Sequence, residues 1–107
     1  MKRKIEEVLI KIGVPCANLG FEYITESILI LEEKEIKFTD LYAEVAKRYN
    51  TTSQRVERNI RTCLSKVRKN FDDYDLVDYY IGFKNCENSN SLCLLRYRIN
   101  SEMESEE

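Results

Sequence analysis

Two stretches with helical periodicity meet at a short polar turn in the middle of this chain. Residues 39–49 place their apolar side chains on one face of a helix, and Thr39 is a suitable N-cap. Asn50 follows, and asparagine tolerates the left-handed backbone that ends many helices. Residues 51–53, Thr-Thr-Ser, then offer N-caps for a longer helix at about 52–69. A helix, a tight turn and a longer helix in this order predict a helix-turn-helix.

The rest of the chain also favours helices over strands. We predict an all-α fold, a single domain of six helices at about residues 2–12, 19–33, 39–49, 52–69, 72–80 and 91–100. Asp72 and Asp73 are expected to cap the fifth helix, and Gly82 to end it. The only extended piece is expected at residues 80–84. The domain is therefore assigned to residues 1–100, followed by an acidic disordered tail at 101–107.

Positive charge gathers around the second helix of the predicted motif. Residues 47–69 carry eight basic side chains against one acid, Glu57. Residues 1–46 carry six basic and nine acidic side chains, and residues 70–107 carry three and nine. A concentrated positive segment in a chain of net charge −2 is typical of a surface that attracts a polyanion. A solvated helix face can show the same pattern, so charge alone does not decide between the two interpretations.

A helical wheel of residues 53–69 separates a core stripe from an outward face. Val56, Ile60 and Val67 share an apolar arc of about 100° with the other apolar residues, and long polar side chains lie opposite. A recognition helix in the major groove reads base edges near its N-terminus, where arginine pairs with guanine and a carboxylate such as Glu57 accepts from cytosine. The turn residues 51–53 suit phosphate contacts. The wheel therefore favours DNA binding.

Other chemistries find little support in this sequence. The chain has no histidine, no glycine-rich phosphate loop and no serine or cysteine nucleophile beside a plausible base. Its four cysteines lack the spacing of a zinc site, and we expect Cys16, Cys63 and Cys93 to be small buried residues in a reduced cytosol. No signal peptide or membrane span is evident. We predict a cytoplasmic protein that is not an enzyme and that uses no cofactor and no metal.

Residues 41–61 resemble the helix-turn-helix of the effector domain of the stage-zero sporulation protein A family of response regulators. The most specific part is the run Asn-Thr-Thr-x-x-Arg-Val-Glu-Arg-x-Ile-Arg at residues 50–61. The similarity continues at Ile12–Pro15, Gly20–Tyr23, Ile81–Phe83 and Asn90–Ser91, and it spans about residues 5–100. It implies a six-helix effector domain that binds short asymmetric DNA boxes, often as tandem copies.

By position, the resemblance implies base reading by Arg55, Glu57 and Arg58. The residues predicted to contact the DNA backbone are Thr51, Thr52, Ser53, Gln54, Arg61, Lys47, Arg48 and Lys69. Two features depart from the family pattern: Ala43 stands where the family usually has proline, and the connector at 34–40 is shorter. The family's regulators also carry an N-terminal receiver domain, so this chain is expected to be either a fragment or a stand-alone copy.

The sequence therefore predicts a sequence-specific, double-stranded DNA-binding transcriptional regulator whose recognition helix, about 52–69, enters the major groove. The expected partners are double-stranded DNA, a homodimer or tandem copy on DNA, and RNA polymerase or a related full-length regulator, with no membrane. The alternative is a stand-alone protein-interaction module or decoy that modulates a full-length sporulation-type regulator or RNA polymerase. The acidic C-terminal third has no explanation in DNA binding alone.

Overall fold

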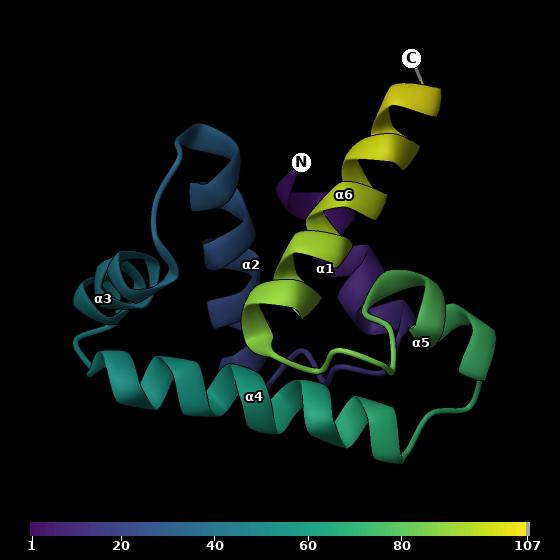
Figure 1. Cartoon of the computed structure of the whole chain (residues 1–107), viewed down its shortest axis with the longest axis horizontal. Helices are drawn as coiled ribbons and strands as arrows, with labels where there is room; N and C mark the ends of the chain where they lie inside the picture. The colour runs from purple at the N-terminus through teal and green to yellow at the C-terminus, as the bar shows by residue number, and fades with distance from the viewer. Residues whose placement is uncertain (107) are drawn as a thin grey trace.

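The computed structural model describes residues 1–106, and these form six α-helices and no strand (Figure 1). The helices are α1 (Lys2–Lys11), α2 (Leu19–Glu33), α3 (Phe38–Arg48), α4 (Ser53–Lys69), α5 (Tyr74–Tyr80) and α6 (Asn88–Glu106). The predicted all-α, six-helix architecture is confirmed. The extended piece expected at residues 80–84 is wrong, because the end of α5 and a turn occupy these positions.

Helix α2 lies at the centre of the fold and packs against α1, α3, α4 and α6. Nine of its fifteen residues are buried, so it presents apolar surface in several directions. The buried hydroxyls of Thr25 and Ser27 donate to main-chain carbonyls one turn earlier, which satisfies them inside the core. Gly20 brings α2 close to α4, since a Cβ there would lie only 2.7 Å from Cβ of Cys63. Backbone proximity at this point fixes where α4 sits.

A single hydrophobic core joins all six helices. Each helix contributes at least two side chains that are no more than about a tenth exposed. The largest fully buried side chains are Ile5, Leu9, Ile24, Ile28, Ile30, Leu41, Ile60, Leu64, Ile81, Leu92, Leu95 and Ile99. Aliphatic side chains dominate this set, and their burial supplies the main driving force for folding. None of the helices in residues 1–106 has the length and apolar character needed to cross a bilayer.

Helix α3 begins one residue earlier than predicted, and without the expected cap. Its N-cap is Lys37, which makes no side-chain capping bond, and Thr39 lies inside the first turn. Phe38 packs against the core and its ring lies 6.1 Å from that of Tyr42. Burial of this aromatic ring outweighs the loss of one capping bond, which contributes about 1 kcal/mol.

Helix α6 is longer at both ends than the sequence analysis predicted. It starts at Asn88 instead of Ser91, because the Asn88 side chain is buried and bonded to α4. At the other end it continues through Glu106, across most of the segment expected to be a disordered tail. Residue 107 lies outside the described part of the chain.

Long-range bonds account for the added helical turns at the end of α6. The Glu102 carboxylate accepts a hydrogen bond of 2.6 Å from the Tyr80 hydroxyl and lies 3.1 Å from Nζ of Lys4. The same ammonium lies 3.3 Å from Glu106. Part of the acidic C-terminal third therefore serves to attach α6 to α1 and α5.

The cysteines behave differently from one another. Cys63 is buried between α2 and α4 as predicted, and burial raises the pKa of its thiol to about 11. Cys16 and Cys93 are exposed, which contradicts the prediction that they are buried. Cys16 follows Pro15 in the loop after α1, and Cys93 lies on the outer side of α6, next to the buried Leu92. Within residues 1–106, no group of three or more metal-binding side chains lies together.

Candidate nucleic-acid interface

The turn between α3 and α4 has the geometry that the sequence predicted. Asn50 adopts a left-handed conformation with φ of 53°. The amide of Thr51 donates to the carbonyl of Ala46 (2.9 Å), and the amide of Asn50 donates to that of Lys47 (3.4 Å). This pair of bonds is a Schellman motif, which satisfies the last carbonyls of α3. The Thr52 hydroxyl then caps α4 by accepting from the amide of Arg55 at 3.2 Å.

Helix α4 exposes the face that the helical wheel assigned to a ligand. Its apolar side chains Val56, Ile60, Cys63, Leu64 and Val67 are all buried against the core. The helix runs along one edge of the molecule with no other helix beneath it (Figure 1). The side chains opposite the core stripe are exposed or half-buried. The core stripe therefore fixes the rotation of α4 and directs its polar side chains outward.

Two of the three predicted base-reading residues point freely into solvent. Arg55 and Arg58 are exposed, and neither makes a side-chain bond or ion pair with another residue in 1–106. Glu57 is half-buried on the flank of α4, and its carboxylate pairs with Arg61 one turn later. The structure thus brings Glu57 and Arg61 together and leaves the two arginines available.

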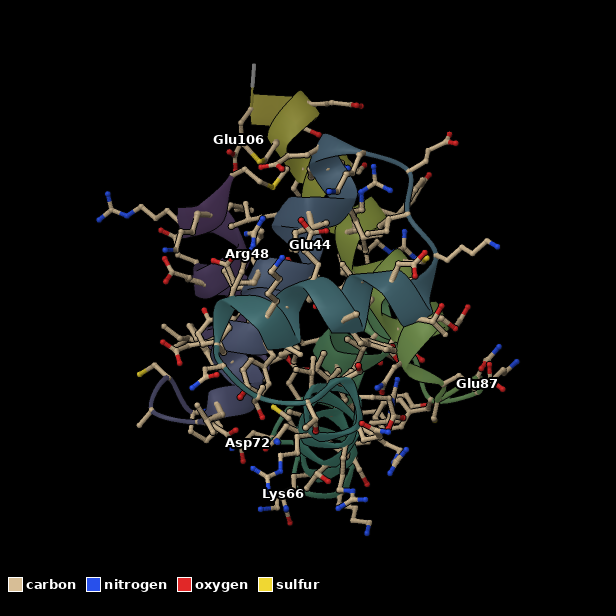
Figure 2. The ribbon with its side chains drawn as sticks, turned by 90° about the vertical axis from the view of Figure 1, so that its left-hand side faces the viewer. Glu44, Arg48, Lys66, Asp72, Glu87 and Glu106 are labelled. Carbon is tan, nitrogen blue, oxygen red and sulfur yellow. The ribbon has the colours of Figure 1, made fainter. Side chains whose placement is uncertain are left out.

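The predicted backbone-contacting residues fall into two groups. Thr52, Gln54, Lys47 and Lys69 are exposed, and Thr51 and Ser53 are half-buried at the turn. Arg61 is exposed, but its guanidinium forms an ion pair with Glu57. Arg48 is also ion-paired, because its guanidinium lies 2.9 Å from Glu26 and 3.4 Å from Glu44. Figure 2 shows Arg48 and Glu44 together on α3.

Sequence reasoning missed two roles in the basic segment. Lys66, which we did not include among the site residues, is exposed near the lowest point of α4 in Figure 2. Arg68 is half-buried and donates three hydrogen bonds to Ile81, Gly82 and Ser91, so it is not part of the outward surface. On the wheel both residues lie on the flanks of the core stripe, Lys66 about 60° beyond Cys63 and Arg68 about 40° beyond Leu64, so the wheel alone does not separate their roles.

The acidic end of α6 lies far from α4, whereas Asp72 lies near Lys66 at the end of α4 (Figure 2). Lys66 on α4 and Glu106 on α6 lie at opposite ends in Figure 2, and Figure 1 places the C-terminus far from α4. The acidic end of α6 therefore does not oppose an anion approaching α4. A localised positive surface on a weakly acidic domain attracts and orients a polyanion.

A comparison with known protein families agrees with this geometry. The family model described as sporulation initiation factor Spo0A C terminal matches residues 5–98. The match includes α2 to α5 entirely and most of α1 and α6, together with the whole of the α3–α4 turn. The match therefore covers nearly all of the core and not the motif alone.

Proposed function

The chain belongs to the Spo0A C-terminal family of non-enzymatic DNA-binding domains, and from this we propose that it regulates transcription by binding specific double-stranded DNA sequences through α4. In this proposal α3, the turn and α4 form the helix-turn-helix, and α4 enters the major groove. The observation that carries the proposal is the outward face of α4. No other helix covers this face, several basic side chains gather on it, and the two arginines near the helix N-terminus make no bond to other side chains of residues 1–106.

Base reading is proposed for Arg55, Glu57 and Arg58. The two arginines have no partners among residues 1–106, so they lose no internal bond when they pair with the O6 and N7 atoms of guanine. Glu57 is paired with Arg61 in the free domain. A cytosine N4 donor would share or replace this contact, which makes Glu57 a reader whose orientation depends on Arg61.

Backbone contacts are proposed for the residues that surround these readers. They are Thr51, Thr52, Ser53 and Gln54 at the start of α4, Arg61 and Lys69 along it, and Lys47 and Arg48 at the end of α3. The hydroxyls and amides at the start of α4 can donate to phosphate oxygens, and the lysines supply charge. Arg48 has five donors, so it can reach a phosphate while it keeps part of its bonding to Glu26.

The direct test is fluorescence anisotropy of the purified chain with a duplex carrying the family's DNA box and with a scrambled duplex. We expect the box to bind at least about tenfold more tightly, because specific sites exceed non-specific DNA by large factors. Affinity for both duplexes should fall steeply as salt increases, since cation release accompanies each phosphate contact. Equal and weak binding to both duplexes would contradict the proposal.

A protein-interaction role is the second candidate, and an exposed aromatic cluster favours it. The rings of Tyr74 and Phe83 stack at 4.6 Å, and Phe71 packs edge-on against both. Tyr74 is 50% exposed and Phe71 is 39% exposed, and a contiguous exposed aromatic patch is typical of a surface that contacts another protein. A related regulator, RNA polymerase or a second copy of the domain on tandem DNA boxes would be the partner.

This second candidate makes a different prediction in the same assay. If protein contacts are the main function, the domain alone will not discriminate between the two duplexes, but it will be retained by a full-length regulator of the family. Tyr74→Ala should then abolish retention. If DNA binding is the main function, Tyr74→Ala should leave the affinity for the box unchanged.

A further inference from the structure

The connection between α5 and α6, together with the first turn of α6, is bonded to α4 at two points. We call residues 81–91 the strap. The Arg68 guanidinium joins the two ends of the strap, because it donates to the carbonyls of Gly82 (2.7 Å) and Ile81 (2.9 Å) at its start and to Oγ of Ser91 (2.6 Å) at its end. The second attachment is at the start of α6, where the side-chain amide of Asn88 donates to the carbonyl of Glu57 at 2.9 Å.

These two attachments place the strap along one side of the recognition helix. Glu57 and Arg68 are eleven residues apart, so at about 100° per residue they lie within roughly 20° of each other around the helix. At about 1.5 Å per residue they are separated by roughly 16 Å along its axis, or three turns. Arg61 lies on the same flank between them. The strap therefore lies beside the part of α4 that carries the proposed DNA contacts.

The Arg68 anchor is chemically specific and internal. Arg68 makes no ion pair within residues 1–106, and all three of its bonds go to neutral oxygen atoms of the strap. Burial lowers the pKa of its guanidinium somewhat, but arginine remains charged in proteins. The two carbonyls lie where α5 ends and Gly82 turns the chain with φ of +74°. A cation at a helix C-terminus is favourable, and it fixes the path of the strap.

Between its anchors the strap is open to solvent. Residues 84–87 are all exposed. Lys84 is the strap's only cation, and it makes no ion pair or hydrogen bond within residues 1–106. Glu87 is the only acid of the strap, and it lies at the α6 end, so it leaves the Lys84 end as the cationic part.

We propose that the strap is a second DNA-contacting element, in which Lys84 contacts a backbone phosphate and Arg68 is a positioning residue that holds the strap in place. The inference rests on the proposed function. A helix in a major groove about 12 Å wide has a phosphate backbone on each side. An element held against one flank of α4 is therefore adjacent to one of these backbones. Arg68 contributes to binding through the strap and does not touch DNA.

The experiment measures anisotropy with the box and the scrambled duplex over a salt series for Lys84→Ala, with Lys2→Ala as control. Lys2 is also exposed, but it lies near the N-terminus, away from α4 (Figure 1). Loss of one phosphate contact should reduce the slope of log affinity against log salt by about 0.9 and weaken both duplexes about fivefold near 0.15 M salt. Lys2→Ala should leave both quantities unchanged. Equal behaviour of the two variants would overturn the strap contact.

Arg68 is tested by a double-mutant cycle with Lys84. If Arg68 acts through the strap, Arg68→Ala should show the same loss as Lys84→Ala, and adding Lys84→Ala to it should cost nothing more. If Lys84→Ala costs the same fivefold in both backgrounds, Arg68 does not position the strap. Circular dichroism checks that Arg68→Ala folds. Should it not fold, Arg68→Lys replaces it in the cycle: lysine keeps the charge but cannot make the forked bonds, so a direct phosphate contact would survive and the strap contact would not.

The same measurements separate a failure of this inference from a failure of the proposed function. If the wild-type chain prefers the box but Lys84→Ala binds like Lys2→Ala, the strap inference is wrong and the function stands. If the wild-type chain shows no preference for the box, the proposed function itself is wrong.

Discussion

Helices α4 and α6 both carry many charged side chains, but they use them in different ways. On α6, Arg96 lies 2.7 Å from Glu32 of α2, and Glu102 is bonded to Tyr80 and Lys4. On the outward face of α4, Arg55 and Arg58 have no partner within residues 1–106. Arg96 and Glu102 of α6 are engaged in holding the domain together, whereas Arg55 and Arg58 of α4 remain available to a ligand.

This difference teaches how a chain with a net negative charge can present a cationic surface. Charge that is neutralised by a partner on another helix contributes little to the field outside the molecule. Unpaired charge on one uncovered helix contributes most of it. The distribution of partners, more than the composition, decides where a polyanion would bind.

The largest expected effect comes from comparing the loss of an unpaired arginine on α4 with the loss of an ion-paired arginine on α6. Arg58→Ala should weaken binding to the box by about 1–3 kcal/mol, or roughly 5- to 150-fold, and leave the melting temperature unchanged. Arg96→Ala should do the opposite: the affinity stays the same, and stability falls by less than about 1 kcal/mol because this ion pair is partly solvated. Anisotropy and thermal unfolding of both variants measure the contrast. Loss of DNA affinity in Arg96→Ala would contradict the distinction between the arginines of α4 and α6.

A smaller effect is expected where α5 meets α6. Tyr80 is 3% exposed, and its hydroxyl donates to Glu102 at 2.6 Å. Tyr80→Phe should lower the free energy of unfolding by about 1 kcal/mol, which corresponds to a melting temperature lower by roughly 4–8 °C. Tyr97→Phe is the matched control, because Tyr97 is 64% exposed and should be neutral. DNA affinity should be unchanged in both variants.

Arg48 is intermediate between the ion-paired arginines and the unpaired ones. Its guanidinium pairs with Glu26 on α2 and with Glu44 on α3, yet its side chain is 44% exposed. Arg48→Ala should weaken binding to both duplexes about fivefold and reduce the salt slope by about 0.9 if it contacts a phosphate. Glu26→Gln removes the ion pair and keeps the arginine, so it should retain affinity. If Arg48→Ala binds like the wild type, Arg48 is a structural residue like Arg96.

The elements that could be predicted from sequence are those whose signals are local. The left-handed Asn50, an N-cap among residues 51–53 and the core stripe of α4 each depend on a few neighbouring residues, and the structure agrees with all three, with Thr52 as the cap. Asp73 likewise caps α5 as expected, by accepting from the amide of Leu76. Local backbone chemistry determines these features with little help from the rest of the chain.

The features that escaped prediction depend on contacts between distant residues. In the last turn of α6, Glu106 forms an ion pair with Lys4, about 100 residues earlier in the chain, and no local sequence pattern predicts this contact. The role of Arg68 depends on carbonyls thirteen and fourteen residues away, in a turn with few sequence constraints. The charge count included Arg68 in the basic segment, but a count does not show what each side chain contacts. The separation between free and engaged charges therefore becomes visible only once the fold is known.

The smallest effect expected is a pH dependence that belongs to α6 and not to α4. Burial raises the pKa of the Glu102 carboxyl, but the bonds from Tyr80 and Lys4 outweigh burial and hold the pKa below its ordinary value of 4.5. The carboxylate therefore contributes stability that is complete above the unfolded pKa and is lost as pH falls through the folded pKa.

Glu102→Gln should be less stable than the wild type near neutral pH, and the difference should shrink as the pH is lowered toward about 3. Thermal unfolding across this range measures it, with Glu104→Gln as the control, since Glu104 is exposed on the same helix. Parallel curves for wild type and Glu102→Gln would show that the pairing on α6 contributes no pH-dependent stability.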